Sequence, residues 1–320
     1  MTNDGGTETS SVVVSLSMKI LHLPAFAAVF VALSAFPLVA QHSLPGLSVT
    51  PLRPAPGGIV RVALESAGDS VLTVTGDMAG EALHFRRSTQ SLWRAIGPMP
   101  VDATTATVRA FTEYSSGRVD TSLVSITPPV RAPSTSRPRR LAVSSRFTRP
   151  LDSATQARID RENELAREIG RRAHDTPPLW SASFLRPRPS AVTSRFGSGR
   201  MFNGTVTSRH LGVDFSGGVG ATVRAANRGV VALADTFFLA GSVVYLDHGG
   251  GVVTGYFHLS RTLVSPGDTV ERGQQIGLVG ATGRVTGPHL HWSARYGALT
   301  VNPVDLLSLG AYYYGAQRER

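Results

Sequence analysis

The chain of 320 residues contains no cysteine and a single lysine, Lys19. Without cysteine, disulfide bonds, thiol nucleophiles and cysteine-ligated zinc sites are all excluded. A metal ion in this protein must therefore be held by histidine and carboxylate side chains. Charged residues make up only 17% of the chain, against 33 glycines and 20 prolines, and this balance favours strands and turns over long helices.

The net charge of +10 comes almost entirely from arginine. A basic surface is compatible with nucleic acid, with anionic lipid, or with an anionic polymer such as bacterial cell wall. The sequence contains no arginine-rich helix and no RRM-type or zinc-knuckle pattern. We therefore predict no nucleic-acid partner.

The N-terminal 40 residues resemble an export signal. An apolar run from Leu23 to Ala40 follows Met18-Lys19 and ends on a small residue, which predicts cleavage near Gln41. Residues 1–17 carry acidic but no basic side chains, so Met18 is a second candidate for the translation start. Because 18 apolar residues are just long enough to span a bilayer, an uncleaved membrane anchor is the alternative. We expect an exported protein of the periplasm or cell envelope.

Residues 41–130 are predicted to form a small β-sandwich-like module. Short apolar runs alternate with Gly, Pro, Asp and Ser clusters at roughly 10-residue spacing, as in all-β sandwiches. The candidate strands are 59–64, 71–75, 82–85, 92–96, 107–112 and 123–127. His84 is interpreted as an ordinary strand side chain, and the module as a docking or spacing unit.

Residues 131–180 are predicted to contain a linker rich in proline and arginine and then one helix. Ser153 and Gln156 have the spacing of an N-terminal capping box, and Pro177-Pro178 ends the helix. His174, near the C-terminus, is interpreted as a surface residue that suits the helix dipole. The helix carries a thin apolar stripe that is predicted to pack on a neighbouring domain. The stripe consists of Ile159, Leu165, Ala166 and Ile169.

Residues 181–310 return to β-type patterning, and 311–320 form a tail. Two histidine motifs in this stretch have the spacing of metal ligands. His210 and Asp214 lie four residues apart in a glycine-containing turn that enters a strand. His289 and His291 are two apart on a predicted strand, so both imidazoles project from one face. His258 ends another strand, where a lone histidine has an ordinary structural interpretation.

Taken together, these residues indicate a catalytic metal site. Two histidines and one aspartate provide three ligands and leave the fourth tetrahedral position for water, the arrangement of catalytic zinc. Imidazole and carboxylate without thiolate suit Zn²⁺. Two histidines then remain for proton transfer or charge stabilisation.

Three motifs in order resemble the M23 zinc metallopeptidases, also called the LytM or lysostaphin type. They are RHLGVD (209–214), YFHLS (256–260) and GRVTGPHLH (283–291), with a hairpin-like segment at 267–280 between the last two. The resemblance covers roughly residues 186–303 and implies an antiparallel β peptidase domain. It implies one zinc ion per chain on His210, Asp214 and His291, with His258 and His289 as catalytic residues. Phe257, where a small residue is common in the family, is expected to point away from His258.

The resemblance implies an enzyme that hydrolyses peptide crosslinks of peptidoglycan with zinc-activated water. The alternative is a non-catalytic LytM-type regulator of cell-wall amidases, but regulators of that kind lack metal ligands, and all five site positions are present here. The segment 267–283 also resembles the hairpin of biotinyl carriers, which need a lysine that this region lacks. His248 is expected to close a strand.

Overall fold

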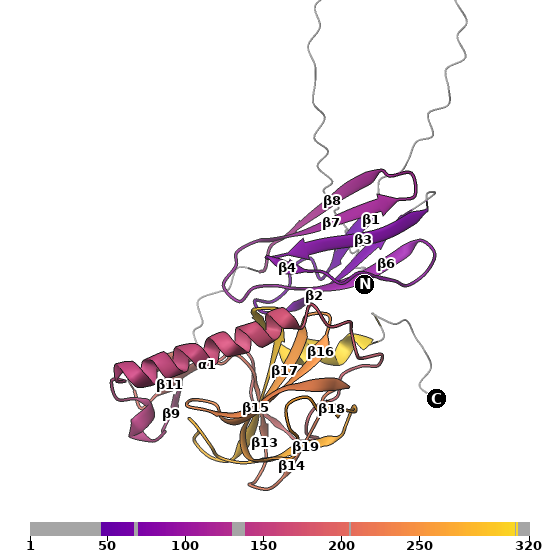
Figure 1. The fold of residues 1–320 in the computed structure, drawn as a ribbon. Coiled ribbons are helices and arrows are strands. Elements are labelled where there is room, and N and C mark those ends of the chain that lie inside the picture. The colour runs from indigo at the N-terminus through magenta and orange to yellow at the C-terminus, as the bar shows by residue number, and fades with distance from the viewer. Residues whose placement is uncertain (1–45, 67–69, 130–137, 205, 311, 313–320) are drawn as a thin grey trace, which may run out of the picture.

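The computed structural model describes residues 46–66, 70–129, 138–204, 206–310 and 312. The prediction of a mainly β chain is confirmed: α1 (Ser153–Arg172) is the one α-helix of the described residues. Figure 1 shows a β module above a larger C-terminal domain, with α1 along the side of that domain that faces the module. The predicted export signal lies outside the described residues. Within them, no helix has both the length and the hydropathy needed to cross a membrane.

The β module consists of two four-stranded sheets, ordered β1-β2-β6-β5 and β4-β3-β7-β8. Alternate side chains of β7 are buried, because strand side chains point in turn to the core and to solvent. The sequence prediction did not include β1. It also made the strand at 82–85 too long, since only Ala82 of that range belongs to β4. The strands are β1 (Gly46–Thr50), β2 (Ile59–Glu65), β3 (Val71–Met78), β4 (Glu81–Ala82), β5 (Arg86–Arg87), β6 (Leu92–Pro98), β7 (Ala106–Tyr114) and β8 (Val119–Ile126).

Helix α1 begins one residue earlier than the proposed capping box implies. Its N-cap is Asp152, whose carboxylate accepts a 2.7 Å hydrogen bond from the Thr155 amide. Aspartate caps as well as serine does and also places a negative charge at the positive end of the helix. The Gln156 side chain instead bonds Asp160, so the Ser153–Gln156 box is not formed. In the predicted stripe, three residues are buried and Leu165 is 37% exposed.

The C-terminal domain is built on a ten-stranded sheet whose main path runs β10-β13-β20-β17-β16-β15-β18. A separate three-stranded sheet, β12-β11-β9, includes a short strand from the segment predicted to be a linker. The strands are β9 (Arg139–Leu141), β10 (Val192–Ser194), β11 (Gly199–Phe202), β12 (Val206–Arg209), β13 (Val213–Ser216), β14 (Thr222–Arg224), β15 (Gly229–Phe237), β16 (Gly241–Gly249), β17 (Val252–Thr262), β18 (Thr269–Val270), β19 (Gln275–Val279), β20 (His289–Tyr296) and β21 (Leu299–Val301), and short 3₁₀ turns lie at η1 (Ser145–Phe147) and η2 (Pro303–Ser308).

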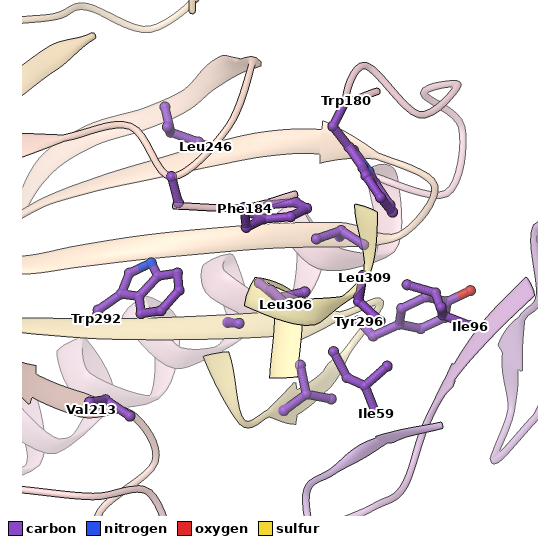
Figure 2. Packing of buried hydrophobic residues seen from close by; sticks show 14 of the residues in the cluster. Ile59, Ile96, Trp180, Phe184, Val213, Leu246, Trp292, Tyr296, Leu306 and Leu309 are labelled. Carbon is purple, nitrogen blue, oxygen red and sulfur yellow. The ribbon is translucent and has the colours of Figure 1, made fainter. Parts of the chain in front are cut away.

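The two domains share one hydrophobic core. Figure 2 shows Ile59 and Ile96 of the β module beside Tyr296, Leu306 and Leu309 of the C-terminal domain. All five side chains are at most 7% exposed and belong to a single buried cluster. The module is therefore packed against the C-terminal domain.

The sequence interpretations of His84 as an ordinary strand residue and of His174 as a surface residue are wrong, because the two side chains meet at this domain junction. Their rings stack, and His84 Nε2 lies 2.8 Å from His174 Nδ1. The other nitrogen of His174 lies 2.9 Å from the Glu81 carboxylate, which also accepts a 2.9 Å hydrogen bond from the Ala298 amide. His84 lies beyond the end of β4, and His174 is enclosed by the junction rather than set on the surface.

His248 lies within β16, as expected, but inside the core. Its Nδ1–H donates to the Arg228 carbonyl, and its Nε2 lies 2.8 Å from the Thr254 hydroxyl. Burial lowers the pKa of His248 to about 4. This histidine is structural, and it does not line the groove described below.

Candidate metal centre

The histidine motifs meet where strands β13 and β20 pair. In the antiparallel register Asp214 lies opposite His291 and Ser216 opposite His289, so the carboxylate and the imidazole are cross-strand neighbours. His210 precedes β13 and reaches the same point because its loop passes close to β20. A Cβ atom at Gly212 would lie 2.5 Å from the His291 ring, so only glycine permits this approach.

Three ligand atoms converge on one point. His210 Nε2 and His291 Nδ1 each lie 2.9 Å from Asp214 Oδ1, and they lie 2.9 Å from each other. The three residues are buried and form the one His/Cys/Asp/Glu group of the described residues with the geometry to hold a metal ion. Two imidazole nitrogens and a carboxylate oxygen at one buried point are a donor set that suits zinc.

Groups behind these ligands fix their orientation. The Arg195 carbonyl lies 3.0 Å from His210 Nδ1, and because a carbonyl can only accept, this nitrogen carries the proton. The lone pair of His210 therefore lies on Nε2, the atom that faces Asp214. Asp214 directs its second oxygen to the Arg200 guanidinium. Outer hydrogen bonds of this kind hold metal ligands in a binding geometry.

The environment keeps both ligand imidazoles neutral at neutral pH. Burial lowers the pKa of His291 to about 4 and also lowers that of His210, although Asp214 opposes both shifts. Burial would raise the pKa of Asp214, but the close contacts with the imidazoles of His210 and His291 hold it well below its usual range. The site therefore offers two neutral imidazoles and one carboxylate, the protonation states that a metal ion requires.

His258 and His289 lie beside these three residues. The His258 ring centroid is 4.9 Å from that of His289 and 5.9 Å from that of His291, and His289 Nε2 lies 3.7 Å from Asp214 Oδ1. Each Nδ1 faces a backbone carbonyl, of Thr282 at 2.8 Å and of Gly287 at 2.9 Å. Each Nδ1 therefore holds the proton, and the lone pair lies on Nε2. Burial, with nearby His291 and His289, holds the pKa of His258 well below its usual range.

Phe257 was expected to point away from His258, but both side chains line the same groove. The Phe257 ring stacks on His291, with centroids 5.1 Å apart and an interplanar angle of 16°. The expectation assumed regular alternation along β17, but the register against β16 shifts between Tyr256 and Leu259, and His258 has a φ of 64°. Such a bulge breaks the alternation, so Phe257 and His258 both face the site.

A groove of about 810 Å³ opens at the site. His291, Ser293 and Arg295 project into it from one face of β20. The C-terminal domain and α1 supply most of the remaining lining, and the β6–β7 loop of the module, residues 100–103, completes it. The β module thus contributes part of the groove wall, and the docking or spacing role predicted from the sequence stays a prediction.

The structure brings together all five residues singled out from the sequence: His210, Asp214, His258, His289 and His291. Sequence reasoning missed Arg200, which contacts Asp214, and the carbonyl groups that orient the histidines. Arg200 lies in a hairpin rich in small residues without any motif spacing, and backbone carbonyls leave no trace in a sequence. No sequence signal could have identified them.

Comparison with known proteins finds similarity in the region that contains the site. The model of peptidase family M23 matches residues 208–303. Over 83 residues the chain is 48% identical to the peptidoglycan DD-endopeptidase ShyA of Vibrio cholerae, covering 26% of this chain and 19% of ShyA. It is 42% identical over 97 residues to the DD-carboxypeptidase/endopeptidase Mpg of Neisseria meningitidis, covering 30% of this chain and 22% of Mpg. The chain thus matches about a fifth of the length of these curated relatives.

The fold likeness extends beyond the matched segment. The solved structure of a candidate M23 peptidase from Pseudomonas aeruginosa superposes with a TM-score of 0.61 at 25% identity. The match covers 80% of this chain and 95% of that one, so it includes much of the region before residue 208.

Proposed function

We propose that the chain is a member of peptidase family M23, whose model matches residues 208–303, and that it is a zinc metalloendopeptidase that hydrolyses peptide crosslinks of bacterial peptidoglycan. The observation that carries the proposal is the convergence of His210, Asp214 and His291 at 2.9 Å, with His258 and His289 beside them. The likeness to ShyA, a peptidoglycan DD-endopeptidase, supports the substrate class.

His210, Asp214 and His291 would hold one zinc ion per chain. Bound zinc would lower the pKa of a coordinated water to about 7 and polarise the substrate carbonyl. The two imidazoles are neutral because burial lowers each pKa, and Arg200 orients the carboxylate, so the ligand set is ready to bind a cation.

His258 and His289 would manage the protons of the reaction. Hydrolysis adds water oxygen to the carbonyl carbon, breaks the C–N bond and delivers a proton to the leaving nitrogen. Each ring keeps its Nε2 lone pair free of the backbone, so each can take up a proton from the attacking water and later pass it to the amine. Once protonated, the same nitrogen can donate a hydrogen bond to the developing oxyanion.

Digestion of purified peptidoglycan tests this proposal. We expect the protein to release peptide-cleaved muropeptides, identified by mass spectrometry, to lose this activity with a chelator, and to regain it with zinc. Metal analysis should find one zinc per chain in the wild type and much less in His210→Ala or Asp214→Ala. A protein that binds zinc but cleaves no peptidoglycan, and instead stimulates an amidase, would support the regulator alternative.

A further inference from the structure

The groove beside the metal centre is lined by arginines. Its lining includes Arg167, Arg200, Arg209, Arg284 and Arg295. Among the described residues that line it, Asp102 is the only acidic one. A concave surface with this excess of positive charge favours an anionic ligand.

Four of the five guanidinium groups are engaged by protein groups. Arg167 pairs with Glu164 at 2.8 Å, and Arg200 pairs with the ligand carboxylate of Asp214. Arg209 pairs with Asp102 of the β module at 2.7 Å. Arg295 donates to the Ala298 carbonyl and to the Thr300 hydroxyl. These arginines have structural partners in the protein itself.

Arg284 differs from the other four. Within the part of the chain that the structure describes, its guanidinium has no hydrogen-bond or ion-pair partner and lies 4.2 Å from the ring centroid of Phe202. An aromatic ring holds the guanidinium plane in place while leaving its edge N–H groups free. A planar fork of free N–H donors fits a carboxylate through two parallel hydrogen bonds.

The position of Arg284 places this fork near the reacting groups. Its loop also contains Thr282, whose carbonyl accepts a hydrogen bond from His258 Nδ1–H. Phe202, which contacts Arg284, lies two residues from Arg200 on β11. Side chains two apart on a strand share a face, so those of Phe202 and Arg200 lie roughly 7 Å apart. Arg200 contacts Asp214, and burial together with the nearby charge of Arg200 lowers the pKa of Arg284, so Arg284 lies on the side of the groove next to the metal ligands.

We infer that Arg284 binds a free carboxylate of the substrate next to the scissile amide, and so selects crosslinks whose leaving nitrogen sits on a carboxylate-bearing carbon. This inference rests on the proposed function. A crosslink through diaminopimelate has such a carboxylate, whereas one through the lysine side chain or within a glycine bridge has none beside the leaving nitrogen. Arg284 is thereby a specificity determinant that distinguishes the first of these crosslinks from the other two.

The test compares two crosslinked muropeptide dimers of the diaminopimelate type. One has a free carboxylate beside the scissile nitrogen, and in the other this group is amidated. We expect the wild type to cleave the free-acid dimer with a kcat/KM roughly 10- to 100-fold higher, as expected for a hydrogen bond between charged groups. Arg284→Ala should lose this preference and keep its zinc, and Arg284→Lys should recover part of it. The control is Arg261→Ala, an exposed arginine of the same domain outside the groove lining, which should behave as the wild type.

Calorimetric titration with the uncrosslinked stem peptide, free or amidated, gives a readout that needs no turnover. If the wild type binds the free acid more tightly and Arg284→Ala does not, the inference is supported even when neither dimer is cleaved. A failure to cleave either dimer would overturn only the proposed function. Equal cleavage and equal binding of both forms by the wild type would overturn the inference and leave the peptidase proposal standing. An equal loss on both forms in Arg284→Ala would show a structural role and also overturn it.

Discussion

At the scale of single residues, the proposed function divides the candidate site into metal ligands and proton-handling groups, and this division can be measured. His258→Ala and His289→Ala should each keep zinc near one per chain, because neither belongs to the converging ligand set. Each should still lower kcat by ~10²–10⁴-fold, as removal of a positioned acid or base does. Metal analysis and turnover on one preparation check both statements.

His289 gives the sharper of these two tests, because His291 is two residues away on the same strand face. His291→Ala serves as the comparison and should lose zinc together with activity. The opposite pattern, with zinc lost in His289→Ala and kept in His291→Ala, would refute the ligand assignment without refuting a peptidase.

His248 predicts a pH dependence of stability that does not involve the metal. Its pKa is about 4 in the folded protein, against 6.5 as the ordinary value, so between these values the unfolded chain binds more protons. The stabilisation is therefore fully present above pH 6.5 and falls as the pH drops toward 4, by about 3 kcal/mol. Denaturant unfolding of metal-free protein at pH 4 to 7 should show a smaller loss in His248→Gln than in the wild type. Equal losses would contradict this assignment.

At the residue scale, sequence reasoning identified the five histidine and aspartate side chains because motif spacing survives in the sequence. It failed for Phe257, because the β-bulge at His258 turns the Phe257 and His258 side chains to the same site without changing any residue type. It also failed for Arg284, whose importance depends on the partners that it lacks in the folded chain.

At the scale of elements, the longer strands were predictable from alternating burial, and α1 was predictable from its stripe and the prolines after it. The short strand β9 was not, because Arg139–Leu141 has a linker-like composition and pairs only through its backbone with β11. The helix start was misplaced by one residue because Asp152 and Ser153 are both good caps, and only the hydrogen bond to Thr155 distinguishes them.

Helix α1 leads to a prediction in which the usual effect of a substitution is reversed. Replacing glycine by alanine inside a helix ordinarily stabilises it. At Gly170, however, the new Cβ would lie 1.9 Å from the carbonyl oxygen of Gly297, a backbone atom that cannot move aside easily. Gly170→Ala should therefore destabilise the protein by roughly 1–3 kcal/mol. Thermal unfolding should show a lowered Tm, whereas Arg161→Ala on the exposed helix face should leave it nearly unchanged; a raised Tm in Gly170→Ala would disprove the contact.

At the scale of the whole molecule, three distant segments meet at Gly297. The end of α1, the β20–β21 turn and Glu81 of β4 pack together there, and a side chain on Gly297 would collide with Glu81. A φ of 55° at this glycine allows the turn. The sequence could not reveal the junction, because His84 and His174 are 90 residues apart and look unremarkable in their own segments.

From this junction we predict that the β module and the C-terminal domain unfold together. They share one hydrophobic cluster, and Glu81 accepts hydrogen bonds from the Ala298 amide and His174. Glu81→Ala would leave these two part-buried donors without their acceptor, at a cost of roughly 2–4 kcal/mol. Differential scanning calorimetry should show one transition for the wild type, and for Glu81→Ala a lower Tm with the β module separating from the main transition. Glu113→Ala, an exposed glutamate of the same module, is the control and should leave the profile unchanged. Two separate transitions already in the wild type would show that the shared cluster does not couple the domains.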